Sequence, residues 1–371
     1  MVRYIALVSV ALFCLSCDNL ATNVSSAEQN EPLTATEIIH QMDVGFNLGN
    51  TFENGYNSTD SYEIAQLILL YKESGMNHIR IPVTWMEGFD GDPLSDENGK
   101  VNFNHPRFLE LKKVIDFALE QGLYVVINAH HERHFKENYD NSDSFNDKFT
   151  TLWTDIANFF QEYDQRLIFE VLNEPEGAFG QMGGDPSHND PLAIEYTRKI
   201  MQIGIDAIRS TGGNNRTRIV MIGTNSWGNH NQIFTNYPDR ESLPGGGEDD
   251  YLAIQIHSYD PWEFCGQDGD NSAYPGNDVI INRMKEVASH GEELGVPLHY
   301  GEFGVGRRIS QSQRDTRLVR DYYRTVVQTA KAEGMASSAW DDRGWFGLTN
   351  GSAENGFSFR FGIVPYMLQS P

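Results

Sequence analysis

The sequence predicts a single (β/α)8 barrel, also called a TIM barrel, and two observations lead to this prediction. Eight short apolar runs have the length and composition of buried strands. Amphipathic stretches with helical spacing separate most of these runs. Strand and helix alternating eight times is the pattern of a closed parallel barrel wrapped by helices. The runs are GFNL at 45, HIRIPV at 78, YVVINA at 124, LIFEVL at 167, RIVMIG at 218, LAIQIH at 252, PLHYGEF at 297 and SSAW at 337.

The amphipathic stretches are clearest where they begin at Ser61, His105 and Arg317. The helix after the fifth run is poorly defined. After Trp340 the chain is rich in Gly and aromatic residues, so the closing helix should be short or absent. No Pro/Ser-rich linker or fixed-period repeat interrupts the later chain, so we expect one catalytic domain over residues 34–371.

The first 17 residues have the features of an export signal: one Arg, a short apolar run, and then Ser16-Cys17. This junction resembles a bacterial lipoprotein leader, in which Cys17 would become the lipidated first residue. Residues 18–33 form a polar linker. The alternative is plain secretion with cleavage near residues 25–27. We expect either a cell-envelope lipoprotein, most simply of the outer membrane, or a secreted protein.

Composition limits the possible partners. The 371 residues include 52 Asp and Glu against 28 Lys and Arg, which gives a net charge of -24. Such a charge repels a phosphate backbone, so nucleic acid is not an expected partner. A neutral sugar is compatible with it. With 39% hydrophobic residues the chain can bury a large core, and we expect a monomer. If the leader is lost and Cys17 is lipidated, Cys265 is left without a disulfide partner.

Active sites of this architecture lie at the C-terminal ends of the strands, which makes the polar residues there the candidates for function. Each of them taken alone has an ordinary structural explanation, such as an ion pair or a helix cap. Together they converge on one rim of the barrel. The candidates are Arg80, His130 with His131, Asn173 with Glu174, His257 with Tyr259, Glu302, and Trp340 with Asp341.

Glu174 and Glu302 each close an apolar run, at the ends of the fourth and seventh strands. Two facing carboxyl groups can cleave an acetal: one protonates the leaving oxygen while the other attacks the anomeric carbon. A separation of about 5 Å leaves no room for water and gives retention through a covalent intermediate. One carboxyl group must then be ionised and the other protonated.

Seven ordered motifs make the chain resemble glycoside hydrolase family five, a cellulase-type family of retaining barrel glycosidases in clan A. The resemblance covers roughly residues 34–345. The motifs are GFNLGNTF at 45, HIRIPVTW at 78, INAHHE at 127, LNEPEG at 172, IHSYDPW at 256, YGEFG at 300 and SSAWDD at 337.

The resemblance implies that Glu174 is the acid/base and Glu302 the nucleophile, whose pKa Arg80 should hold down. It also implies a cis peptide bond after Trp340, and we expect no cofactor or metal. It also assigns supporting roles to the surrounding residues. Asn173 would hold the sugar 2-hydroxyl, Arg80 and Tyr259 would orient the nucleophile, His130, His131 and His257 would line the subsite, Trp340 would form its floor, and Asn47 belongs to the same supporting set.

Further aromatic residues suggest a carbohydrate cleft. Trp85, Trp227, Trp262 and Trp345 follow strand ends, and their indole faces can stack on sugars. We expect Trp227 and Trp262 to do so, because polar residues surround them. The chain departs from its relatives at Phe46, where many have Trp, and at Phe52-Glu53, where Leu-Asp is frequent. We expect these changes to touch substrate subsites.

The predicted function is a retaining endo-acting β-glycoside hydrolase, most simply an endo-β-1,4-glucanase acting on a β-linked polysaccharide. An endo-β-1,4-mannanase, a xyloglucanase and a mixed-linkage glucanase remain open, because gluco and manno epimers differ in one hydroxyl. Two other classes of protein are alternatives to a glycoside hydrolase. A metal-dependent hydrolase would use His130-His131-Glu132, but no further ligand completes that site. A non-catalytic glycan-binding lipoprotein would need to have lost a carboxylate, and both are present.

Overall fold

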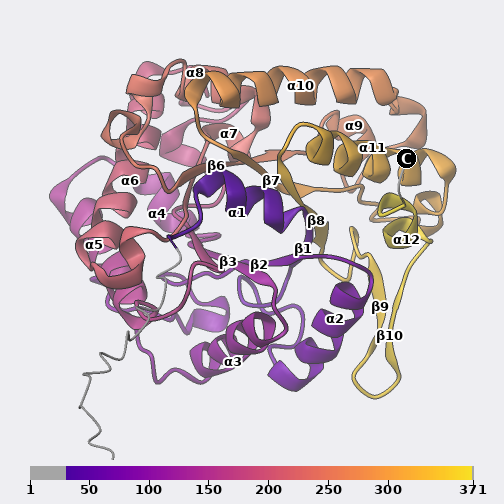
Figure 1. Cartoon of the computed structure of the whole chain (residues 1–371), viewed down its shortest axis with the longest axis horizontal. Coiled ribbons are helices and arrows are strands. Elements are labelled where there is room, and N and C mark those ends of the chain that lie inside the picture. Colours follow the sequence, from indigo (N-terminus) through magenta and orange to yellow (C-terminus); the bar gives the residue numbers. More distant parts are fainter. Residues whose placement is uncertain (1–30, 370–371) are drawn as a thin grey trace, which may run out of the picture. The chain divides into compact units, whose positions relative to one another are not determined.

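The computed structural model describes residues 31–369, of which residues 33–369 belong to one compact unit. Its eight parallel strands form a closed barrel in the order β1 to β8, which confirms the predicted fold (Figure 1). The strands are β1 (Val44–Leu48), β2 (His78–Ile81), β3 (Tyr124–Asn128), β4 (Leu167–Glu170), β5 (Val220–Gly223), β6 (Leu252–Ser258), β7 (Leu298–Phe303) and β8 (Ala336–Asp341).

Long helices pack around most of the strands, as the amphipathic stretches predict. Several of them begin where a capping side chain or a proline favours a first turn: Asp60 accepts from the backbone of α2, and Asp190 precedes Pro191 at the start of α6. The long helices are α2 (Ser61–Glu73), α3 (Pro106–Glu120), α5 (Asp143–Phe159), α6 (Pro191–Ser210), α10 (Asn277–Leu294) and α11 (Arg317–Ala332).

Short helices and turns occupy the loops between the strands and the long helices, most of them after the C-terminal end of a strand. The segment between β5 and β6 contains only short pieces, in line with its poorly defined helical pattern. Over the whole barrel, the short α-helices are α4 (Arg133–Asn138), α7 (Asn225–Gly228), α8 (Ile233–Asn236) and α9 (Trp262–Cys265). The single-turn 3-10 helices are η1 (Phe89–Gly91), η2 (Gly177–Phe179), η3 (Gly213–Arg216), η4 (His230–Gln232), η5 (Arg240–Ser242), η6 (Pro244–Gly247), η7 (Asn271–Ala273) and η8 (Gln311–Arg314).

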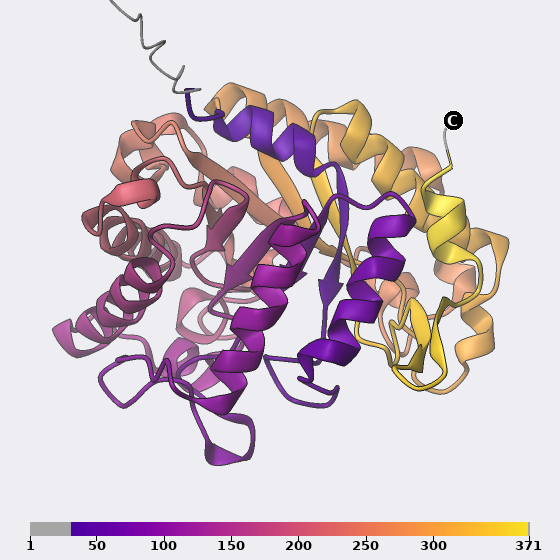
Figure 2. The same ribbon diagram turned by 60° about the horizontal axis from the view of Figure 1, so that its bottom comes forward.

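The chain closes with an antiparallel hairpin that the sequence analysis did not predict, formed by β9 (Thr349–Ser352) and β10 (Gly356–Phe359). The last helix, α12 (Ile363–Met367), is short, as expected. In Figure 2 the hairpin lies at the lower right of the barrel and α1 (Ala35–Met42) lies at the top.

Helix α1 lies against the N-terminal end of the barrel and was also not predicted. Thr34 and Glu37 form a capping box that starts it. Ile38 and Ile39 are fully buried and belong to a cluster with side chains from the barrel interior, including Val126. The N-terminal end of the barrel is therefore sealed by apolar contacts, which leaves the opposite end for the site.

Replacing Ile38 with Ala is expected to lower the free energy of unfolding by about 2–5 kcal/mol, because the change leaves a cavity in a fully buried cluster. Urea denaturation measures this difference. The control is Thr36→Ala on the exposed side of the same helix, which should change stability by less than about 0.5 kcal/mol. Equal effects of the two variants would contradict the sealing role of α1.

No helix within residues 31–369 is long and apolar enough to cross a membrane. The predicted leader at residues 1–17 and most of the linker at residues 18–33 lie outside the described residues. Cys265 is buried and forms no disulfide in this described part of the chain.

Candidate active site

Arg80 is the centre of the site. It lies on β2, and its guanidinium group is fully buried. One nitrogen donates to Glu302 at 2.7 Å and to the Asn47 side chain at 2.9 Å, and another donates to the Asn173 side chain at 2.6 Å. Asn47 in turn donates to the carbonyl of Gly301 at 2.9 Å. Asn47 is fully buried, and both ends of its amide are occupied by these contacts, so it supports the site from inside the barrel.

Glu170 also binds Arg80, and the sequence analysis missed it. Its carboxylate accepts from Arg80 Nε at 2.6 Å and from Arg80 Nη2 at 2.7 Å, which is a bidentate ion pair with both side chains fully buried. Asn128 donates to the same carboxylate at 3.0 Å. A charged residue inside the apolar run LIFEVL was the signal available in the sequence.

Replacing Glu170 with Gln is expected to lower the free energy of unfolding by about 3–5 kcal/mol, because it removes the bidentate counter-charge of the buried Arg80 guanidinium and leaves only its single contact with Glu302. Urea denaturation provides the measurement. The matched control is Glu286→Gln, which breaks an exposed ion pair with Arg283 and should cost less than about 1 kcal/mol. A Glu170 variant as stable as this control would show that the buried pair contributes little.

Glu302 lies on β7 and is nearly buried. One of its oxygens accepts from Arg80, and the other accepts from the Tyr259 hydroxyl at 3.1 Å. Burial raises the pKa of Glu302 above its ordinary value, and the nearby Glu174 adds to this, although Arg80 acts in the opposite direction. Arg80 thus lowers the pKa of Glu302, as expected, but the desolvation of this carboxyl group outweighs the effect and the net shift is upward.

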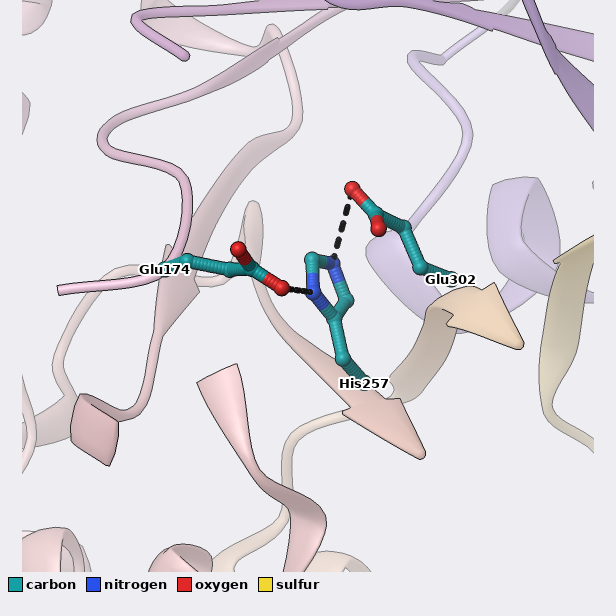
Figure 3. A group of neighbouring side chains, drawn as sticks. All are labelled: Glu174, His257 and Glu302. Atoms are coloured by element: carbon teal, nitrogen blue, oxygen red, sulfur yellow. Dashed lines mark hydrogen bonds and ion pairs between the residues drawn. The ribbon is translucent and has the colours of Figure 1, made fainter. Parts of the chain in front are cut away.

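Glu174 follows β4 in a left-handed backbone conformation, with φ of 46°. Its Oε1 lies 2.9 Å from His257 Nδ1, and His257 Nε2 lies 3.7 Å from Glu302, so the imidazole stands between the two carboxyl groups (Figure 3). Desolvation raises the pKa of Glu174 to about 7. Burial lowers the pKa of His257 to about 4, so this imidazole is neutral near pH 7. Glu174 is thus suited to hold a proton.

The two histidines after β3 lie beside Trp340, as expected. The rings of His130 and Trp340 are nearly parallel, with centroids 6.1 Å apart, and the His131 ring meets that of His130 edge to face. Burial lowers the pKa of both histidines, in His131 to about 3. His130 is nearly buried and His131 is half-buried. Both imidazoles are therefore neutral groups at the wall of the site.

The expected cis peptide bond after Trp340 was wrong. Among the described residues, the cis bonds precede Pro186 and Pro261. Trp340 and Asp341 instead continue β8 and stay in parallel register with Asn47 and Leu48 of β1, so the strand pairing places the Trp340 side chain.

Glu132, the third member of the HHE sequence, binds backbone amides of the loop after β2. Its carboxylate accepts from the backbone amides of Trp85 and Met86, at 2.6 and 3.0 Å. Burial raises the pKa of Glu132 to about 7. Glu132 therefore anchors the loop after β2 and is not placed to join His130 and His131 around a metal ion.

The tryptophans separate into buried and exposed groups. The Trp227 side chain is 41% exposed and that of Trp262 is 51% exposed, as expected for residues that stack on a ligand. Trp345 is also exposed, at 45%. Trp85 is fully buried, and its indole N–H donates to the Asn128 carbonyl at 2.8 Å. Trp85 is therefore part of the core.

The departures at Phe46 and Phe52-Glu53 do not face the cleft, which corrects our expectation. Phe46 is fully buried and stacks on Tyr71, with ring centroids 3.8 Å apart. Phe52 is also fully buried, and Glu53 accepts from the backbone amide of Thr51 at 2.8 Å. These residues support the loop after β1 from within.

Two carboxyl groups facing each other at the C-terminal ends of barrel strands, beside a buried arginine and aromatic side chains, define a barrel glycoside hydrolase. The sequence profile of the cellulase family, glycosyl hydrolase family 5, matches residues 40–343. The chain therefore belongs to glycosyl hydrolase family 5, a family of retaining enzymes, as its motifs indicated.

Curated proteins and solved structures agree with this assignment. Endoglucanase A of Clostridium longisporum is 29% identical over 94% of this chain and 69% of that protein. Endoglucanase A of Paenibacillus barcinonensis is 28% identical over 87% of this chain and 86% of that protein. The structure of a broad specificity endoglucanase from Clostridium longisporum superimposes with a TM-score of 0.74 at 26% identity, covering 91% of this chain and 97% of that one.

Proposed function

We propose that this family 5 enzyme is a retaining endo-β-1,4-glucanase in which Glu302 is the nucleophile and Glu174 the acid/base. The observation that carries the proposal is a separation: a carboxylate oxygen of Glu174 and one of Glu302 lie within 4.8 Å of each other. Inverting enzymes need about 6.5–9.5 Å to admit a water molecule, whereas retaining enzymes have about 5 Å. The arrangement therefore favours direct attack on the sugar.

The surroundings of the two glutamates favour a charge on Glu302 and a proton on Glu174. Glu302 accepts from a guanidinium and from a hydroxyl, and both contacts stabilise the carboxylate. Glu174 faces a neutral imidazole, and its pKa of about 7 keeps it protonated in mildly acidic solution. When the glycosyl ester forms, the charge of Glu302 disappears, so the pKa of Glu174 falls and this residue can activate water.

The sugar under attack would contact Asn173 and the histidine wall. In the described part of the chain, the Asn173 side-chain N–H group is buried without a hydrogen-bond partner, while its oxygen is held by Arg80. An unpaired buried donor beside the nucleophile is suited to a sugar 2-hydroxyl, a contact that strengthens in the transition state. His130, His131 and Trp340 would form the adjoining surface.

The exposed indoles would bind the sugar units beyond the cleaved bond. Trp227 follows β5, which pairs with β4, the strand that precedes Glu174. Trp262 follows β6, which pairs with β7, the strand that contains Glu302. Stacked indoles bind pyranose faces without reading individual hydroxyl groups. They are thus compatible with cleavage inside a long β-1,4-glucan, and also with the mannan, xyloglucan and mixed-linkage alternatives.

A substrate panel tests the proposed activity. The purified protein is incubated with soluble cellulose derivatives, mixed-linkage glucan, xyloglucan and β-mannan, and reducing ends and viscosity are followed together. An endo-β-1,4-glucanase should reduce the viscosity of the cellulose derivative early, while few reducing ends have formed. Release of reducing ends without loss of viscosity would contradict endo action, and activity on mannan alone would contradict the glucanase assignment.

We also propose that the protein is an exported monomer held to a bacterial membrane through lipid on Cys17. Replacing Cys17 with Ala should move the protein from the membrane fraction to the soluble fraction or leave it unprocessed. Fractionation and mass measurement of the N-terminus test this. A wild-type protein that is already soluble and begins at Glu28 would contradict lipidation and support plain secretion.

A further inference from the structure

A buried lysine lies beneath the acid/base residue and has no role in the mechanism described so far. Lys136 of α4 is only 1% exposed. Its Nζ lies 3.3 Å from the backbone carbonyl of Asn173 and 3.2 Å from that of Glu174. Burying an ammonium group is costly unless it is paired and hydrogen-bonded. Lys136 therefore holds the main chain at the point where it turns into a left-handed conformation at Glu174.

The anionic partner of this lysine connects it to an exposed indole. One oxygen of Glu176 lies 3.3 Å from Lys136 Nζ. The other accepts from the indole N–H of Trp227 at 2.6 Å. Trp227 is in a left-handed conformation, with φ of 60°, and its ring is half-exposed. A single carboxylate thus joins the buried cation to the exposed ring of Trp227.

We propose that Lys136 and Glu176 are positioning residues of the glycosidase: their ion pair holds the backbone of Glu174 and the ring of Trp227 as one unit. The proposal rests on the assignment of Glu174 as acid/base. It goes beyond that assignment, because neither residue contacts the reacting atoms and neither belongs to the candidate site residues.

The two charges act on the Glu174 proton in opposite directions. Lys136 lowers the pKa of Glu174 and Glu176 raises it, while desolvation is the larger cause of its raised value. Removing one charge should therefore shift this pKa one way, and removing the other should shift it the opposite way. The remaining titratable groups around Glu174 stay in place in both variants: His257 of β6, Tyr259 after it, Glu302 of β7, Arg80 of β2 and Glu170 of β4.

The test is the alkaline limb of the pH profile of kcat/KM on a soluble β-1,4-glucan, measured with the full chain. Glu176→Gln should move this limb to lower pH, and Lys136→Met should move it to higher pH, each by roughly 0.5–1 pH unit. Lys136→Arg keeps the charge, so the alkaline limb of its profile should lie at the same pH as in the wild type. A purely structural defect would reduce activity without shifts of opposite sign.

Two controls accompany these variants. Lys113→Met and Glu110→Gln break an ion pair on α3, and both should leave the limb unchanged. An aryl cellobioside with a good leaving group needs no proton in glycosylation, so its kcat/KM should change less than twofold in every variant. Glu176→Gln should in addition raise KM for the polysaccharide, because the Trp227 ring is released from its carboxylate.

Shifts in the same direction, or no shift in variants that melt like the wild type, would overturn the proposal. Glu176 is partly exposed, so Glu176→Gln keeps the test decisive if Lys136→Met does not fold. The variant Glu174→Ala separates this result from the function assignment. If that variant keeps full activity on the polysaccharide, the acid/base assignment is wrong. If Glu174→Ala instead loses activity on the polysaccharide and keeps ester formation on the aryl cellobioside, it behaves as an acid/base variant should. If the alkaline limb then does not move in the Lys136 and Glu176 variants, only the role of the ion pair is wrong.

Discussion

Replacing Glu302 with Ala is expected to lower kcat on every β-1,4-glycoside by on the order of 10⁴- to 10⁶-fold, because the covalent intermediate can no longer form. The loss should not depend on the leaving group, since attack on the anomeric carbon is needed for good and poor leaving groups alike. Steady-state rates on the polysaccharide and on an activated aryl cellobioside measure it.

The Glu302 variant should fold, which makes the loss interpretable. Without Glu302, Arg80 still has its bidentate ion pair with Glu170 and its contacts to Asn47 and Asn173. The buried guanidinium therefore keeps a full counter-charge. A melting temperature close to that of the wild type is the control for this point.

Azide gives the Glu302→Ala test a stereochemical outcome. The space vacated by the carboxylate admits a small anion, which would displace the leaving group of an aryl β-cellobioside in one step and give the α-glycosyl azide. Formation of the β-glycosyl azide by this variant, or activity close to that of the wild type, would contradict the assignment of Glu302 as nucleophile.

The barrel and the strand-end residues could be predicted because both depend on local patterns. A parallel strand buried on both faces reads as a continuous apolar run, and a polar residue at its end marks the rim of the barrel. Arg80, Glu174 and Glu302 all stand at such positions. Their meeting in space then follows from the closure of the barrel.

The contacts between these residues could not be predicted, because they depend on which inward-facing side chains meet across the barrel. In the sequence the apolar run LIFEVL continues past Glu170, so Glu170 was read as lying inside the strand, whereas β4 ends at this residue. The desolvation of Glu302 also depends on tertiary packing, and it outweighs the lowering effect of Arg80 on the Glu302 pKa. Lys136 gave no sequence signal, because a lysine in a short loop helix is normally exposed.

The substrate-facing surface was predicted in part, because exposure depends on tertiary packing. Polar neighbours in the sequence correctly indicated that Trp227 and Trp262 are exposed. A different argument failed at Phe46, where a difference from the relatives was read as a change in the cleft. The ring instead packs on Tyr71 in the core. Position on a strand does not tell whether an aromatic side chain faces the barrel exterior or the cleft.

Replacing Glu174 with Ala is expected to separate substrates by their leaving group. On the polysaccharide, kcat/KM should fall by about 10²- to 10⁴-fold, because the departing sugar needs a proton. On an aryl cellobioside with a good leaving group, Glu302 should still form the glycosyl ester at nearly the wild-type rate. Hydrolysis of this ester should then be slow, because no general base activates water.

The accumulated ester provides the check on Glu174. Added azide should attack it without a general base, raise turnover of the aryl cellobioside and give the β-glycosyl azide, the product of two inversions. The alkaline limb of the wild-type kcat/KM profile, which follows the Glu174 pKa of about 7, should be absent in this variant. Full activity on the polysaccharide, or an α-azide product, would contradict the role of Glu174, whichever polysaccharide is the natural substrate.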